Sequence, residues 1–394
     1  MFDDLNRDYF NNPRFFNRQF YDSAAHKFVE KYSSHNDVLG IFLFGQVSVP
    51  GVSDLDFIVV MKDRLSEKLD QNYSIDKFAE DLRYIYNETQ PFLLTEDVFK
   101  DFWKIFPTYH LNQIYGKKLT QNKPNKNEER LYNTLILIEI CQNFYPVIFL
   151  KQLASEKFNV RYSLLVLNAF KFPLNLFMQT FDINVDKWSE LNQDVVTLRE
   201  NWFSTTDHER YQNMMDLLKR AAQISTNLMD KLDCCIKNEF WEIDQEKLKK
   251  INEKIVLSDK IYASEFDSRT VLDKMVCNYN NVGKWYSYLP LTFYLPVLKY
   301  SCEKGFVSKL IKKKLKTDDD LFFIKNHDLL EKMKCRVKLM NDHCSFYKNN
   351  DIKVNMVHTY YGYNPNPTRI KFYKKLLKPQ YVLPKMLNSF MSKR

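Results

Sequence analysis

Glycine and cysteine are both scarce in this sequence. Only seven glycines stand in 394 residues, beside 24 tyrosines and 31 phenylalanines, and so little glycine excludes collagen-like, elastic and glycine-rich low-complexity chains. The seven cysteines are scattered and include no C-x-x-C pair, which indicates reduced thiols rather than a disulfide framework. With 45% apolar and 27% charged residues, the composition is that of a globular protein.

The sequence also lacks a secretory signal and a membrane-spanning run. Asp3 and Asp4 stand where a signal peptide carries basic residues, and no apolar stretch follows them. The best membrane candidate, residues 134–150, contains Glu139 and Pro146 and is too short to span a bilayer. We therefore expect a cytoplasmic protein with no membrane span, long enough for two or three domains.

Positive charge is concentrated in the last quarter of the chain. Residues 301–394 carry 21 Lys and Arg against 8 Asp and Glu, whereas the net charge of the whole chain is only +9. The lysines cluster at 309–316 and 371–378, the second time beside aromatic residues. Lysines and aromatic rings together can hold a nucleic acid, although a solvated surface is the commoner reason for such clusters. A nucleic acid thus stays open as a partner of this basic region.

The most informative window lies between residues 37 and 61. Residues 37–45 are almost continuously apolar and end at glycine, which predicts a strand buried on both faces. Residues 54–61 predict a second such strand, and the segment 46–53 between them contains a Pro-Gly turn. Three of the seven glycines fall within twelve residues here, which indicates a backbone that needs positive φ or approaches a ligand.

Hydrophobic spacing predicts further elements around this window. We expect helices over 15–32, 62–87 and 96–106, and extended segments over 91–94 and 110–119. After a polar run at 120–127, apolar residues recur at spacings of three and four, which is typical of helices. The predicted domains are an α+β domain over 1–122 with a mixed sheet and flanking helices, a helical domain over 128–256, and a basic, mixed but mainly helical region over 257–394.

Two acids open the second predicted strand. Asp54 and Asp56 are separated by one residue, so in a strand both carboxylates project from the same face. Two neighbouring carboxylates repel each other, and a divalent cation such as Mg²⁺ or Mn²⁺ removes the conflict while also binding phosphate oxygens. The alternative is a plain turn, in which Ser53 or Asp54 hydrogen-bonds the backbone.

The window resembles the DNA polymerase beta-like nucleotidyltransferase superfamily. That family has an apolar strand, a glycine followed by a serine or glycine, a gap of about seven to thirteen residues, and Asp-x-Asp in the next strand. This chain has Gly45 and Gln46, seven further residues, and then Asp54 and Asp56. The resemblance implies a nucleotidyltransferase-like fold over residues 37–119, in which the two acids bind the metal and the glycine turn contacts phosphates.

The implied activity is metal-dependent transfer of a nucleotidyl group from ATP or another nucleoside triphosphate to an acceptor hydroxyl. The acceptor stays open among a small molecule, a protein and an RNA. Gln46 replaces the usual serine, its amide can still donate a hydrogen bond, and Ser48 and Ser53 are further candidates for nucleotide binding. The family's third carboxylate has no evident counterpart, and Glu96 and Asp97 are the candidates. The alternative is a degenerate fold that binds a nucleotide or serves as an interaction module.

Overall fold

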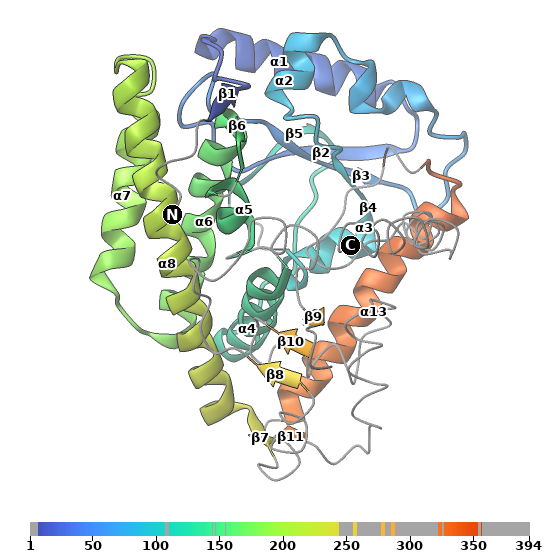
Figure 1. Cartoon of the computed structure of the whole chain (residues 1–394). Helices are drawn as coiled ribbons and strands as arrows, with labels where there is room; N and C mark the ends of the chain where they lie inside the picture. The colour runs from blue at the N-terminus through green and yellow to red at the C-terminus, as the bar shows by residue number, and fades with distance from the viewer. Residues whose placement is uncertain are drawn as a thin grey trace, which may run out of the picture.

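The structure is a computed structural model in which the chain is described over 7–106, 110–143, 145, 147–153, 155–243, 327–353 and 356, and at the short strands of 255–257, 277–279, 285–287 and 322–324. It has a mixed α+β fold, as predicted, with a sheet on one side of a group of helices (Figure 1). The two lysine clusters predicted as a nucleic-acid surface lie outside the described residues. Within the described part, no helix is long and apolar enough to cross a membrane.

A four-stranded mixed sheet carries the informative window (Figure 1). Its strands, in spatial order, are β4 (Phe92–Thr95), β3 (Asp56–Met61), β2 (Val38–Phe44) and β5 (Leu111–Gly116). β2 runs antiparallel to both of its neighbours, whereas β3 and β4 are parallel. The strand predicted over 37–45 is therefore confirmed, as are the extended segments predicted over 91–94 and 110–119. The strand predicted over 54–61 begins only at Asp56, so Asp54 lies in the turn segment before it.

Alternate residues of the central strands face two different layers of helix, as the two-residue period of a strand requires. Phe57 faces α1 (Arg18–Ser33), where its ring stacks on that of Phe28 with centroids 3.6 Å apart. Ile58 faces the other way, into the apolar cluster around α3 (Glu96–Asp101). Burial of both faces explains why these strands are continuously apolar rather than alternating.

The helix predicted over 62–87 is wrong. Two 3₁₀ turns and one short helix, α2, stand there: Gln71–Tyr73, Ile75–Lys77 and Glu80–Ile85. The Asp70 carboxylate accepts a hydrogen bond from the backbone N–H of Asn72 (2.7 Å), and such local bonds compete with the α-helical pattern. The helix predicted over 96–106 is shorter than expected, because α3 passes into a 3₁₀ turn at Phe102–Lys104.

The helical pattern predicted from residue 128 is confirmed. The helices are α4 (Lys126–Asn143), α5 (Val147–Leu153), α6 (Val160–Phe181), α7 (Asp186–Glu200) and α8 (Asp207–Glu239). Their apolar faces share one cluster, in which Trp188 and Trp202 are fully buried. The strand β6 (Lys157–Asn159) precedes α6 and pairs in parallel with β1 (Asp8–Phe10), so the start of the chain joins the helical part.

Small strands near the C-terminal side of the chain form two further sheets. β11 (Phe322–Ile324) pairs with β7 (Trp241–Ile243), and a three-stranded sheet has the order β8 (Ile255–Leu257), β10 (Trp285–Ser287) and β9 (Cys277–Tyr279). None of these strands contributes a residue to the candidate site described below.

A late helix, α13 (His327–Asn349), returns to the sheet and covers its β4 edge (Figure 1). His343 donates from Nε2 to the carbonyl of Leu93 (2.8 Å), and the Leu93 N–H donates to the hydroxyl of Tyr347 (3.3 Å). These bonds satisfy edge groups that would otherwise offer a pairing site to another strand. The predicted division at 122–128 and 256–257 stays a prediction, and the contacts of α13 and β1 cross it.

Asp37 ties the beginning of β2 to the end of β3. Its buried carboxylate accepts hydrogen bonds from Lys62 Nζ (2.9 Å) and the Ser66 hydroxyl (2.7 Å). Burial alone would raise the pKa of Asp37, but these bonds outweigh it and lower the pKa from 3.8 to about 2. A carboxyl with a depressed folded-state pKa stabilises the fold above pH 3.8, and this stabilisation disappears as the pH falls towards 2.

We therefore expect Asp37→Asn to lower the free energy of unfolding at neutral pH by about 2 kcal/mol, because it removes charge-assisted hydrogen bonds. The difference from the parent protein should shrink as the pH falls below 3.8. Urea unfolding at neutral and acid pH measures both values. Asp342→Asn is the control, since Asp342 is exposed on α13. A difference that does not change with pH would contradict the role of the Asp37 charge.

Candidate functional site

The connection from β2 to β3 depends on two glycines with positive φ. Gly45 has a φ of +83° and Gly51 a φ of +85°, a region that other residues rarely adopt. A Cβ on Gly51 would lie 2.1 Å from the Arg14 carbonyl oxygen, so the space there is filled. Gly45 is different, because a Cβ would meet nothing within 4 Å. The backbone at Gly45 therefore borders open space.

Two tyrosines fix the turn that follows. The Tyr21 hydroxyl on α1 donates to the Ser53 carbonyl (2.6 Å) and accepts from the Gly51 N–H (2.9 Å). The Tyr84 hydroxyl on α2 donates to the Gly51 carbonyl (2.7 Å). Burial raises the pKa of Tyr21 to about 12 and also raises the pKa of Tyr84, so both hydroxyls remain protonated and can donate. The turn is thus held rigidly against the helices on the α1 side of the sheet.

Ser53 joins this turn to the helical part of the molecule. Its hydroxyl oxygen accepts from the Val49 N–H (3.1 Å) and from Arg199 Nη2 on α7 (2.9 Å). The hydroxyl of Ser48 lies 3.4 Å from Arg199 Nη2 and from the Ser53 oxygen. Both hydroxyls are committed within the protein, so Ser48 and Ser53 hold the turn rather than point at a ligand.

Asp54 lies next to two buried arginines. Arg161 of α6 and Arg199 of α7 are only 3% and 2% exposed, and a hydrogen bond from Asn87 also reaches the Asp54 carboxylate. Burial raises the pKa of Asp54, although the two arginines and Asn87 act in the opposite direction. Burial also lowers the pKa of Arg199 to about 10, and the Asp54 charge opposes this change. The helices therefore supply counter-charge to one of the two predicted acids.

Asp56 has no such compensation. It is the first residue of β3, opposite Phe44 of β2, and it is half-buried. Burial and the negative charge of Asp54 raise the pKa of Asp56 well above its ordinary value, with no opposing cause. The two carboxylates are thus close enough to repel each other, and in the described part of the chain no cation lies beside Asp56. A half-buried carboxylate of this kind is a typical sign of a functional site.

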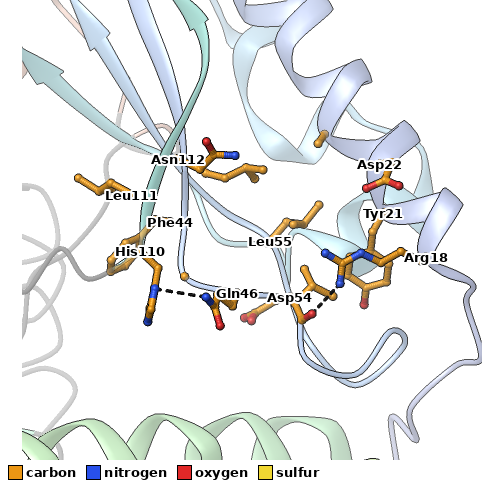
Figure 2. A pocket seen from close by; sticks show the side chains of 14 residues that line it. Arg18, Tyr21, Asp22, Phe44, Gln46, Asp54, Leu55, His110, Leu111 and Asn112 are labelled. Carbon is orange, nitrogen blue, oxygen red and sulfur yellow. Dashed lines mark hydrogen bonds between the residues drawn. The ribbon is translucent and has the colours of Figure 1, made fainter. Parts of the chain in front are cut away.

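A pocket of about 520 Å³ opens beside these residues. The side chains and backbone that line it come from α1, the end of β2, the turn and the start of β5: Arg18, Tyr21, Asp22, Ala25, Leu43, Phe44, Gly45, Gln46, Val47, Asp54, Leu55, His110, Leu111 and Asn112 (Figure 2). Gly45, Gln46 and Asp54 are thus brought together as predicted. Ser48, Ser53 and Asp56 do not line this pocket.

Two hydrogen bonds shape the mouth of the pocket. The Gln46 amide nitrogen lies 3.2 Å from Nδ1 of His110, so the amide donates and the ring accepts (Figure 2). The Arg18 guanidinium donates to the carbonyl of Val47 (2.7 Å), and Arg18 and Asp54 both line the pocket. The site therefore presents donors on both sides of the open space at Gly45.

Glu96 and Asp97 do not reach this site, and their prediction as the third acid is corrected. They follow Thr95, which pairs with Met61 at the far end of β3. Five residue steps separate Met61 from Asp56, or about 16 Å along a strand. Glu96 is instead paired with Lys117 (2.6 Å), and Asp97 with Lys100 (3.0 Å). In the described residues, no three acidic, histidine or cysteine side chains gather as a metal site.

The two acids nevertheless fit a magnesium ion that is shared with a substrate. Mg²⁺ is commonly held by one or two carboxylates together with water and substrate phosphates, rather than by a full cage of protein ligands. Asp56 offers an uncompensated carboxylate, and Asp54 offers a second one at the pocket. The donor set therefore suits a cation that arrives with a phosphate-bearing ligand.

The sequence analysis missed Arg161 and Arg199. One signal for Arg199 is present, because it lies one helical turn after Val195 on the buried stripe of α7 that contains Trp188 and Leu191. A charged residue on such a stripe indicates a buried partner. No spacing in the sequence could pair it with Ser53, which lies 146 residues earlier.

Comparison of the chain with protein-family models, with curated proteins and with solved structures gives no significant match.

Proposed function

We propose that this chain binds a nucleoside triphosphate together with Mg²⁺ or Mn²⁺ and transfers its nucleotidyl group to an acceptor hydroxyl. The observation that carries the proposal is the uncompensated Asp56 carboxylate, whose charge interacts with that of Asp54, and Asp54 lines the pocket where the Gly45 backbone borders open space. The resemblance of residues 40–61 to the DNA polymerase beta-like nucleotidyltransferases supports the same assignment. The antiparallel β2–turn–β3 unit is compatible with it.

Each residue has a role in this proposal. Asp54 and Asp56 would hold the cation, which would supply positive charge to stabilise the attacking and leaving oxygens of the transfer. The Gly45 backbone, the Gln46 amide and the Arg18 guanidinium donate hydrogen bonds to phosphate oxygens. A bond forms between the acceptor oxygen and the α-phosphorus while the bond to pyrophosphate breaks, and the hydroxyl proton passes to solvent water. Arg161 and Arg199 favour the ionised form of Asp54, and Arg199 holds the turn.

Transfer can be tested with each of the four α-labelled nucleoside triphosphates and Mg²⁺, with pyrophosphate release and labelled acceptor as the readouts. Candidate acceptors are the chain itself, RNA, and the small molecules of a cell extract. We expect Mg²⁺-dependent release, which falls at least about 100-fold in Asp54→Asn and Asp56→Asn because stabilisation of the transition state is lost. Asp342→Asn, an exposed acid on α13, should keep the parent rate. Equal release by all four proteins would refute the assignment.

A second candidate function is nucleotide binding without transfer. It is favoured by the missing third acid, since in the described part of the chain no other carboxylate joins Asp54 and Asp56. Phosphoryl-type transfer depends mainly on positioning and electrostatics, so the missing acid weakens the first candidate without removing it. Mg²⁺-dependent nucleotide binding with no pyrophosphate release for any nucleotide would decide for the second candidate.

A further inference from the structure

The polar side chains of the pocket fall into two groups. Several are already engaged with the turn or with each other: Arg18, Tyr21, Gln46 and His110. Asp22 and Asn112 also line the pocket, and among the described residues neither side chain has a hydrogen-bond or ion-pair partner. Polar groups that are free and border a cavity are the ones available to a ligand.

Asp22 and Asn112 lie on opposite walls of the pocket. Asp22 is on α1 and Asn112 on β5, as Figure 2 shows. The hydrogen bonds of Arg18 to Val47 and of Tyr21 to the turn fix α1 against the segment that carries Asp54. Asp22 therefore keeps a constant position relative to the phosphate end of the pocket. Ala25, Leu43 and Leu55 give the pocket an apolar wall on the α1 side of the sheet.

A carboxylate in a pocket for a triphosphate requires an explanation. Near the phosphates Asp22 would repel the ligand, whereas opposite N–H groups it would form charge-assisted hydrogen bonds. An apolar slot with one carboxylate and one amide at its sides suits a flat, polar-edged ring. The base of the nucleotide is the part of the ligand that has these features.

The chemistry of the two side chains distinguishes among the bases. A carboxylate has two oxygens that accept side by side and cannot donate. Guanine alone among the four bases presents two adjacent N–H donors, at N1 and at the 2-amino group, and its O6 and N7 atoms are acceptors. The Asn112 amide can donate to those acceptors while Asp22 accepts from N1 and the 2-amino group. Adenine has acceptors at N1 and N7 and one amino group, so it leaves one carboxylate oxygen unpaired.

We propose that this pocket selects guanine nucleotides, with Asp22 reading N1–H and the 2-amino group and Asn112 reading the acceptor side of the base. The proposal rests on the proposed nucleotide-binding function and names its substrate class. It assigns the base contacts to Asp22 and Asn112 alone, and of the two predicted metal ligands only Asp54 lines the same pocket.

Calorimetric titration of the full chain with GTP, ITP and ATP, each with excess Mg²⁺, tests the proposal directly. ITP differs from GTP only by the absent 2-amino group. We expect GTP to bind roughly tenfold more tightly than ITP or ATP, the effect of a hydrogen bond to a charged group. Asp22→Asn should reduce the GTP preference over ITP to less than about twofold, and Asn112→Leu should weaken GTP binding by roughly tenfold.

The matched control is Glu30→Gln, which removes the same charge from the exposed side of α1 away from the pocket. It should retain the full preference for GTP. Equal affinity of the parent protein for GTP, ITP and ATP would overturn the guanine assignment while leaving the proposed function intact. A preference that survives in Asp22→Asn would also overturn it. Absence of binding by all three nucleotides would overturn both proposals.

Discussion

The Asp56→Asn variant should unfold at a higher temperature than the parent protein when no divalent cation is present. Burial and the Asp54 charge raise the pKa of Asp56, so the folded protein binds this proton more tightly than the unfolded chain does. Stability then falls as the pH rises above 3.8, the ordinary value of the group. At neutral pH the fold must either bury this charge or take up a proton, and the amide removes that cost, a gain of roughly 1 to 2 kcal/mol.

Thermal unfolding in EDTA between about pH 4 and pH 8 measures this effect. Near pH 8 the unfolding temperature of the variant should exceed that of the parent protein by a few degrees. The difference should disappear near pH 4, where the parent carboxylate is protonated. Asp342→Asn, with an exposed carboxylate, should show no such pH-dependent gain. An Asp56→Asn variant that is less stable than the parent protein at neutral pH would show that the carboxylate is stabilised by the fold.

The Arg199→Met variant should lose about 3 to 5 kcal/mol of unfolding free energy, the usual cost of removing one partner of a buried charged network. Arg199 is 2% exposed and donates to the Leu164 carbonyl (3.2 Å) and the Ser53 hydroxyl (2.9 Å). Methionine fills much of the space but leaves both oxygens without this donor. It also removes one of the two positive charges that favour ionisation of Asp54.

The matched control for this variant is Arg220→Met. Arg220 pairs with Asp194 at 2.6 Å, but both side chains are more than 40% exposed, and surface pairs of this kind contribute at most about 1 kcal/mol. Urea unfolding of the two variants at neutral pH gives the comparison. Equal losses in the two proteins would mean that Arg199 does not link the helices to the Asp54 turn.

The sheet was predictable from local sequence, and part of the site with it. The strands β2 and β3 are buried on both faces, so their apolar runs are continuous. Gly45 has a positive φ, as the scarcity of glycine elsewhere in the chain suggested. The prediction of a helix over 62–87 failed although the apolar spacing there is helical. Local side-chain hydrogen bonds, such as the one that Asp70 accepts, favour short turns instead.

The environment of the acids could not be predicted from spacing. The counter-charges of Asp54 come from Arg161 and Arg199, on helices that follow the sheet in the chain and meet it only through tertiary packing. The edge protection of β4 by His343 has the same origin, since 250 residues separate the two partners. Long-range contacts of this kind depend on the whole core and leave no local pattern.

The most direct test of the account is calorimetric titration of Mg²⁺ with a non-hydrolysable nucleoside triphosphate into the parent protein, Asp54→Asn and Asp56→Asn. We predict saturable binding to the parent protein that requires Mg²⁺ and weakens at least about tenfold in each variant, because each carboxylate supplies a charged ligand to the cation. Binding of equal strength to all three proteins, or binding that is indifferent to Mg²⁺, would contradict the claim that these two acids form a cation-dependent nucleotide site.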